Sequence, residues 1–177
     1  SLLGDIWSQW CWDIMVPATT GLVSLLSIIG IANSLALKNK VEPLSAVGIS
    51  VSAYFILLAQ MEDGGFAVSN FEAQGLFTAM ITALIATSIY SYTVHKNWII
   101  KMPESVPSFV SRSFNALIPA AVVLPIFLII RLVVSLTPYD TVTNFIIQVL
   151  QMPLASITTS LVGTLFASFL NSFIWFL

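Results

Sequence analysis

The side chains that could do chemistry are few and lie far apart along the chain. The single histidine, His95, could relay a proton or accept a phosphoryl group, but it stands next to Lys96 at the end of an apolar run. Ionisable groups in a membrane protein indicate function when they are buried inside the membrane. We therefore interpret His95 as a titrating side chain at the membrane surface. Arg131 lies in another apolar run, close to its end at Thr137, and snorkelling to the surface explains it.

The acidic residues suggest no metal site. Glu62, Asp63 and Glu72 fall in one loop that contains two glycines, and solvated carboxylates account for them, since hard cations need several converging oxygens. Asp13 precedes Pro17 by four residues, and a solvent-facing or helix-capping acid is the simplest interpretation.

Other catalytic constellations are also missing from the sequence. The single cysteine, Cys11, excludes an internal disulfide and a cysteine-built metal site. No phosphate-binding loop, zinc motif or serine triad occurs. We expect no cofactor, no metal and no catalytic residue, and we do not expect the chain to be catalytic by itself.

The composition is that of an integral membrane protein. Of its 177 residues, 58% are hydrophobic and only 8% are charged, against about 25% charged in soluble domains. The lipid bilayer is thus an expected partner. The net charge of −2 excludes a nucleic-acid surface, which needs a basic patch. No signal peptide is evident, and the opening SLLGDIWSQW suggests a chain cut from a longer one.

The hydropathy pattern predicts an all-α fold, a polytopic transmembrane helix bundle with about five spans and short interfacial amphipathic helices. Each predicted span is close to the roughly 20 apolar residues needed to cross the hydrocarbon core. The second is short and ambiguous. The predicted spans are Ile14–Leu37, Leu44–Met61, Gly75–Val94, Phe114–Leu136 and Ile157–Leu177. Small residues should let the helices approach closely, namely Gly21, Gly30, Ala32, Ser34, Ala79, Ala83 and Ala86.

The loop charges predict the orientation. Basic residues gather in the loops after the first and third spans, whereas the loop after the second carries only acids. Basic loops stay in the cytoplasm, so Ser1 should lie outside. Tryptophans at the predicted span ends agree with aromatic belts at both surfaces, with Trp7, Trp10 and Trp12 outside and Trp98 and Trp175 inside.

Two interfacial helices are predicted. In the polar stretch Lys96–Pro119, Pro103 and Pro107 interrupt the helix, and Ser105 can cap an amphipathic helix that leads into the fourth span. On the outer side, a helix of about 13 residues is too short to span and ends at Pro153. Its predicted apolar stripe is Val142, Phe145, Ile146, Val149 and Leu150, opposite Asn144, Gln148 and Gln151.

A more specific signal lies in the polar stretch. The letters IKMPESVP at 100–107 and SFNALIP at 113–119 resemble the membrane component, enzyme IIC, of the lactose/cellobiose/diacetylchitobiose phosphotransferase systems. Pro153–Leu154 and Trp175–Phe176 support the likeness, which covers most of the chain from about Gly75 onward and the earlier part more loosely. The family motif at the cytoplasmic segment consists of Lys101, Met102, Pro103, Glu104, Val106 and Pro107.

The resemblance implies a transporter function. Members of this family are all-helical homodimers in the bacterial cytoplasmic membrane that move β-linked disaccharides inward while a separate cytoplasmic enzyme IIB phosphorylates them. Residues 1–177 would form one region, the transmembrane scaffold and dimerisation part, and the sugar-binding half would be absent. The family's sugar-contacting histidine and glutamate lie beyond Leu177, so no substrate-binding residue is assigned. NKVEP at 39–43 matches the glutamate motif by letters, but it lies in a short charged loop and we treat it as a coincidence.

Two other functions remain open at this point. The chain could be a structural module that dimerises or docks a partner, such as enzyme IIB or a bacteriocin that uses such transporters as a receptor. It could also be an unrelated small channel, against which the lack of charges in the span centres argues. The sequence does not specify the disaccharide.

Overall fold

A computed structural model describes residues 12, 15, 18–58, 65–66, 70–98, 100, 111, 114–139 and 141–152. The described helices are α2 (Val23–Lys38), α3 (Pro43–Leu57), α4 (Leu76–His95), α6 (Leu117–Ser135) and α7 (Val142–Ile146). Short 3-10 turns, η1 (Thr20–Leu22) and η3 (Ala73–Gly75), precede α2 and α4, and the π-helix η4 (Ile147–Gln151) continues α7. The predicted all-α bundle is confirmed.

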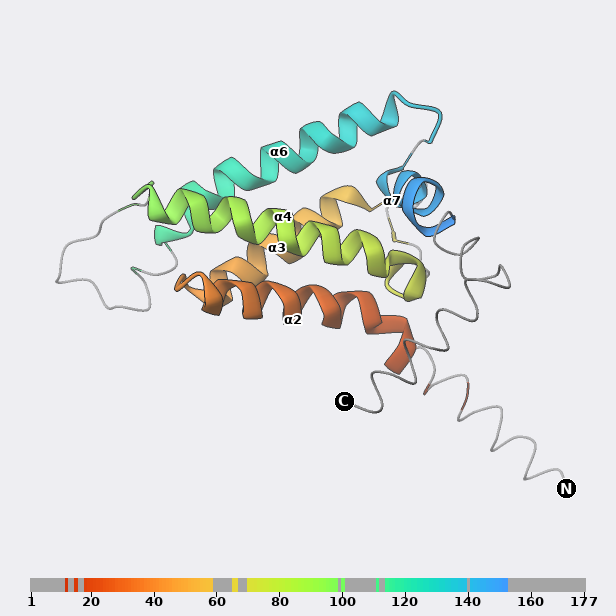
Figure 1. The fold of residues 1–177 in the computed structure, drawn as a ribbon, viewed down its shortest axis with the longest axis horizontal. Coiled ribbons are helices and arrows are strands. Elements are labelled where there is room, and N and C mark those ends of the chain that lie inside the picture. Colours follow the sequence, from red (N-terminus) through yellow and green to blue (C-terminus); the bar gives the residue numbers. More distant parts are fainter. Residues whose placement is uncertain are drawn as a thin grey trace, which may run out of the picture.

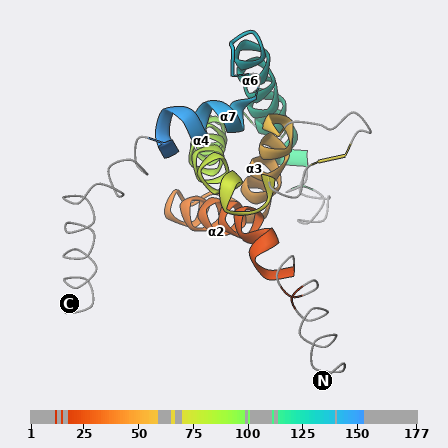
Figure 2. The same ribbon diagram turned by 90° about the vertical axis from the view of Figure 1, so that its right-hand side faces the viewer.

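The four long helices run side by side (Figure 1). Helices α2, α3 and α4 pack against one another, and α6 packs against α3 and α4 on the side away from α2. Helix α7 lies across one end of the bundle, against α4 and α6, as the end-on view shows (Figure 2). The turn from α2 to α3 and the C-terminal end of α4 lie at the opposite end.

Of the described helices, three are long and apolar enough to cross a membrane, and they correspond to the first, third and fourth predicted spans: Thr20–Lys38, Ala73–His95 and Leu117–Ser135. The second predicted span is shorter than expected. Helix α3 ends at Leu57, because Leu58 has an extended backbone with ψ of 142°. The fifth predicted span, Ile157–Leu177, lies outside the described residues.

Local sequence explains where α3 begins. Glu42 precedes the helix with an extended backbone, and its side-chain oxygen accepts a hydrogen bond of 2.5 Å from the amide of Ser45. Pro43 occupies the first turn, where its missing N–H costs nothing. Before it, Lys40 has a φ of 55°, the left-handed conformation that reverses the chain between α2 and α3.

Alanines bring the first three helices close together. On α2, α3 and α4 the fully buried alanines are Ala32, Ala36, Ala46, Ala53, Ala79, Ala83 and Ala86. This confirms the predicted role of Ala32, Ala79, Ala83 and Ala86. Gly30 and Ser34 are exposed on the side of α2 away from Ala32, so they do not contribute to the packing of these three helices.

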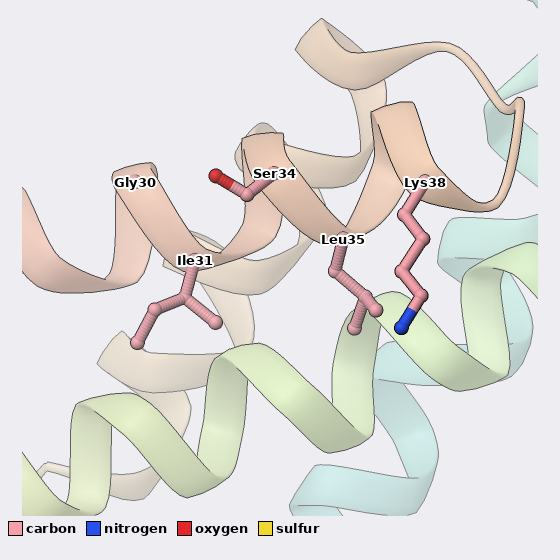
Figure 3. A pocket seen from close by; sticks show the side chains of 5 residues that line it. All are labelled: Gly30, Ile31, Ser34, Leu35 and Lys38. Atoms are coloured by element: carbon pink, nitrogen blue, oxygen red, sulfur yellow. The ribbon is translucent and has the colours of Figure 1, made fainter.

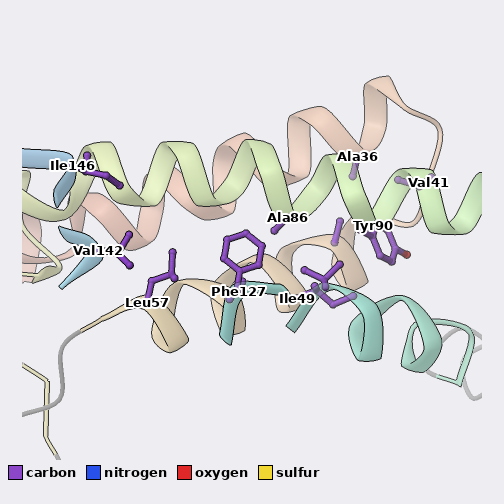
Figure 4. Close-up of a cluster of buried hydrophobic side chains, with 12 residues drawn as sticks. Ala36, Val41, Ile49, Leu57, Ala86, Tyr90, Phe127, Val142 and Ile146 are labelled. Atoms are coloured by element: carbon purple, nitrogen blue, oxygen red, sulfur yellow. The ribbon is translucent and has the colours of Figure 1, made fainter. Parts of the chain in front are cut away.

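Larger apolar side chains fill the space between these helices, α6 and α7. Phe127 of α6 is 1% exposed and lies in a cluster with Ile49 and Leu57 of α3 and Ala86 of α4 (Figure 4). Val142 and Ile146 of α7 belong to the same cluster. The apolar side of α7 is therefore part of the protein core.

Helix α7 and the π-helix η4 depart from the predicted stripe at Val149. Val142 and Ile146 are buried as predicted, whereas Val149 and Leu150 are 47% and 41% exposed. Leu150 still lines one hollow together with Val142, Phe145 and Ile146, but Val149 does not. The i→i+5 bonding of η4 places more residues in each turn and so rotates Val149 away from the stripe.

Candidate functional site

The predicted site segment lies outside the described residues. None of its motif residues is described, so the predictions for Lys101, Met102, Pro103, Glu104, Val106 and Pro107 stay predictions. The same holds for Cys11, Asp13, Glu62, Asp63 and the predicted cap Ser105. The structure does describe the end of the bundle to which this segment is joined, where α4 ends at His95 and α6 begins at Leu117.

Hydrogen bonds join α4 to the α2–α3 turn at this end of the bundle, which we call the basic end because Lys38, Lys40 and Lys96 lie there. Asn39, in the turn after α2, donates from Nδ2 to Oγ of Ser91 on α4 over 3.1 Å. Nε2 of His95 lies 3.1 Å from the carbonyl oxygen of the same Asn39. His95 is exposed, which agrees with its interpretation as a surface side chain. Its ring contacts the α2–α3 turn, a structural partner that the sequence did not reveal.

Exposed lysines surround these hydrogen bonds. Lys38 and Lys40 lie at the α2–α3 turn and Lys96 follows α4, where its Nζ is 5.7 Å from the centre of the Tyr92 ring. The three cations therefore lie at one end of the bundle, on both sides of the Asn39–His95 contact. This placement fits the predicted grouping of basic loops on one side of the membrane.

Glu42 acts in the described structure as a helix cap. Its carboxylate accepts from the Ser45 amide, so the match of NKVEP to a sugar-binding motif has a local structural explanation. The hollow beside it, of about 490 Å³, is lined mainly by apolar residues of α2 and α3, with Asn33 as the other polar member.

Arg131 differs from its sequence-based interpretation. Its Nη1 donates a hydrogen bond of 2.8 Å to the carbonyl oxygen of Ile56, in the last turn of α3. Carbonyls in the last turn of a helix lack intrahelical partners, and a cation there also interacts favourably with the helix dipole. The Arg131 side chain therefore has a specific partner that the snorkelling interpretation did not include. The guanidinium caps a neighbouring helix because α3 ends early enough to be reached.

Further polar contacts hold the loop before α4, at the end of the bundle where α3 ends. Oγ of Ser24 donates to the carbonyl of Glu72 over 2.5 Å, and the Tyr54 hydroxyl donates to the carbonyl of Asn70 over 2.5 Å. Sequence reasoning did not find these residues, because single hydroxyls within apolar runs give no pattern. Deeper in the bundle, the hydroxyls of Ser50 and Thr87 lie 3.1 Å apart.

Several of the described polar groups bond to a neighbouring helix or loop. Among the described residues, no three His, Cys, Asp or Glu side chains come together as metal ligands would. A shallow hollow of about 320 Å³ along α2 is lined by Gly30, Ile31, Ser34, Leu35 and Lys38 (Figure 3). Lys38 is the only charged side chain in that lining, so the hollow offers no set of converging polar groups.

Comparison with known proteins identifies the family. The family model "Phosphotransferase system, EIIC" matches residues 3–177. The cellobiose-specific EIIC component of Geobacillus stearothermophilus is 35% identical over 94% of this chain and 40% of its own length. The lichenan permease IIC component of Bacillus subtilis is 34% identical, with 95% of this chain and 40% of the relative covered.

A solved structure agrees in fold. The crystal structure of the transporter ChbC, the IIC component of an N,N'-diacetylchitobiose-specific phosphotransferase system, superposes with a TM-score of 0.83 and 35% identity. The superposition covers 90% of this chain and 40% of ChbC. The chain thus spans less than half the length of these relatives. The family model also matches the residues before Gly75, where the motifs in the sequence gave only a looser resemblance. The chain belongs to the enzyme IIC family of the phosphotransferase system.

Proposed function

We propose that the chain is the scaffold region of a sugar transporter that moves β-linked disaccharides inward while a cytoplasmic enzyme IIB phosphorylates them. The observation that carries this proposal is the family match over residues 3–177, together with 35% identity to a cellobiose-specific component. Other relatives are named for lichenan, oligo-β-mannosides and lactose, and the lactose relatives are EIICB components. These names share β-linked sugars, and a β-linked disaccharide is the smallest substrate of that class.

The proposed location is the bacterial cytoplasmic membrane, with the basic end of the bundle in the cytoplasm. Lys38, Lys40 and Lys96 at that end support this orientation. The motif segment Lys101–Pro107 would then lie at the inner mouth of the transport path, since α4 ends and α6 begins at the basic end. There the segment could also be reached by enzyme IIB.

The proposed oligomer is a homodimer. Helices α2 and α3 present exposed glycines, Gly30 and Gly48, and a Cβ added at either would meet nothing within 4 Å in the described structure. Small residues on a lipid-facing surface let a second helix approach closely. This surface supports dimerisation through residues 1–177.

Uptake by whole cells tests the transport proposal. The full-length protein would be expressed in a bacterium that lacks its own cellobiose, chitobiose and lactose IIC components but retains the partner IIA and IIB enzymes. We expect accumulation of a phosphorylated disaccharide that depends on IIB. Accumulation of unphosphorylated sugar, or no uptake of any of the three disaccharides, would contradict the proposal.

A second candidate function is a structural module that dimerises or docks a partner without transport of its own. It is favoured by the lining of the hollow between α4, α6 and α7, which is apolar apart from Thr82 and offers no set of groups that would bind a sugar. Residues 1–177 expressed alone would distinguish the two functions. Membrane insertion and self-association without uptake are expected if these residues are only the scaffold, whereas uptake by this region alone would place the sugar path within it.

A further inference from the structure

The hollow along α2, which we call the α2 hollow, has a charge at one end only. Its lining consists of Gly30, Ile31, Ser34 and Leu35, which are small or apolar, and of Lys38 in the last turn of the helix. Ile31, Leu35 and Lys38 extend from α2 on the side of α4 (Figure 3). The α2 hollow is therefore a mostly apolar track that ends in a cation.

The length of this track matches one leaflet of a bilayer. Gly30 and Lys38 are eight residues apart (38 − 30), which is about 12 Å along the helix axis. Half of the hydrocarbon core measures about 15 Å. Because Lys38 lies at the basic end of the bundle, the track runs from the surface of one leaflet almost to the midplane. A Cβ on Gly30 would meet nothing within 4 Å, so the track is open at that depth.

The ammonium of Lys38 is available to an anion. Lys38 is exposed, and its Nζ has no hydrogen bond or ion pair within the part of the chain that the structure describes. Its stem passes beside Leu35, so the methylene groups line the hollow while the ammonium stays at the end (Figure 3). Lys96 differs, because it lies outside the hollow and its Nζ is 5.7 Å from the centre of the Tyr92 ring.

The backbone that carries Lys38 is held in place by α4. Asn39, the next residue, donates from Nδ2 to Oγ of Ser91, and its carbonyl oxygen lies 3.1 Å from Nε2 of His95. His95 is exposed, so its imidazole lies at the same end of the bundle as the Lys38 ammonium. A charged group at this end of the hollow would meet a pre-organised surface between two helices.

We infer that the α2 hollow binds an anionic phospholipid, with one acyl chain along Gly30–Leu35 and the phosphate against Lys38. An apolar track that ends in a cation is complementary to this class of molecule, and basic pockets at the cytoplasmic side of membrane helices bind anionic head groups. An acidic cytoplasmic protein could reach Lys38 but not the apolar track inside the membrane. The inference rests on the membrane location in the proposed function and not on transport.

Native mass spectrometry of the full-length protein tests the inference, because one spectrum reports both the bound lipids and the number of protein copies. The protein would be equilibrated in detergent with equal amounts of phosphatidylglycerol and phosphatidylcholine that carry the same acyl chains. We expect one retained lipid per copy, with a several-fold preference for phosphatidylglycerol. Lys38→Met should abolish this preference and Lys38→Arg should keep it.

Lys96→Met is the matched control for the charge, because it removes a lysine at the same end of the bundle but outside the hollow. We expect Lys96→Met to keep the preference for phosphatidylglycerol. No preference in the unmodified protein, or equal losses in Lys38→Met and Lys96→Met, would overturn the inference, since binding would then follow the overall charge of the surface.

Filling the hollow tests the position of the acyl chain. Ser34→Phe places a ring inside the hollow, whereas Leu37→Phe changes an exposed residue of α2 outside it. We expect several-fold less retained lipid in Ser34→Phe and no change in Leu37→Phe. Equal retention in both variants, displacement of the lipid by glycerol 3-phosphate alone, or loss of the dimer without loss of lipid in Ser34→Phe would each overturn the inference. None of these measurements involves sugar, so their failure leaves the transport proposal standing.

Discussion

At the scale of single residues, the polar groups of this membrane protein act mainly through backbone atoms of neighbouring helices. Arg131 donates to Ile56, Ser24 donates to Glu72 and Tyr54 donates to Asn70, in each case to a carbonyl oxygen. Carbonyls at helix ends and in loops need such partners where water is scarce. These contacts tie segments together that are distant in the sequence.

The cap at the end of α3 leads to a stability prediction. We expect Arg131→Met to lower the free energy of unfolding by about 1.5–3 kcal/mol, the usual contribution of a hydrogen bond to a charged group. Thermal unfolding of the purified protein in detergent measures the change. Lys96→Met is the control, because Lys96 is an exposed cation with only a ring contact to Tyr92, and surface changes typically cost less than about 0.5 kcal/mol. Equal losses of stability in the two variants would mean that the hydrogen bond from Arg131 to Ile56 does not stabilise the fold.

Sequence reasoning reached the surroundings of these residues but not their partners. It placed Arg131 near the outer end of its span and His95 at the membrane surface, because both depend only on distance along an apolar run. The carbonyls of Ile56 and Asn39, which they contact, belong to segments 75 and 56 positions away. Pairing across such separations depends on how the helices pack, which a single sequence does not specify.

At the scale of elements, the loop before α4 depends on one glycine. A Cβ on Gly75 would overlap the carbonyl oxygen of Asn70 and the hydroxyl of Tyr54. Since Tyr54 is itself fully buried and bonded to Asn70, it has little room to move.

We expect Gly75→Ala to destabilise the protein by about 1–3 kcal/mol, the usual cost of overpacking. Gly48→Ala is the matched control, because a Cβ there meets nothing within 4 Å. Unfolding midpoints of both variants, purified in parallel, provide the comparison. A stable Gly75→Ala protein would mean that the loop shifts freely.

The motif segment yields a functional prediction for its two prolines. We expect alanine at both Pro103 and Pro107 to reduce disaccharide uptake several-fold while the amount of inserted protein is unchanged, because proline restricts the backbone and would keep the segment rigid. Radiolabelled uptake normalised to membrane protein level measures this effect. Undiminished uptake would show that the segment needs no such rigidity.

Helix existence was easier to predict than helix ends. The third span was predicted at Gly75–Val94 and α4 runs from Leu76 to His95, because the apolar run is long and bounded by glycine and lysine. The second was predicted to reach Met61 but α3 ends at Leu57, where Arg131 of another helix supplies the cap. The spacing of the apolar residues likewise did not indicate the π-helix η4 that follows Ile146.

At the scale of the whole molecule, the predicted orientation can be tested directly. In a Cys11→Ser background, a cysteine at Lys40 is expected to react with a membrane-impermeant maleimide only in inside-out vesicles. A cysteine at Glu72, exposed at the other end of the bundle, should react only in right-side-out vesicles. Both cysteines reacting from the same side would contradict the packing of the described helices, and a reversed pattern would contradict the orientation.

The family could be recognised from the sequence, whereas the chemistry of a site could not be worked out from it. The motif at 100–107 and 113–119 led to enzyme IIC because several uncommon residues recur together, and the match over residues 3–177 confirms that family. The described helices carry buried alanines and hydroxyls that pack against one another and no converging set of ionisable groups. Packing residues of this kind follow from any close helix bundle and say little about a substrate.

The early end of α3 has a consequence for the surrounding lipid. At 1.5 Å per residue its 15 residues are about 22 Å long, shorter than the roughly 30 Å hydrocarbon core. Its outward stripe of Leu44, Gly48 and Ser52 is exposed in the described chain, and Gly48 belongs to the surface proposed for dimer contact. A helix shorter than the bilayer core is accommodated by local thinning of the bilayer or by oligomerisation, at a cost of fractions of a kcal/mol per Å of mismatch. In the proposed dimer the partner would shield the short α3 from lipid, so bilayer thickness becomes a variable that tunes dimer stability.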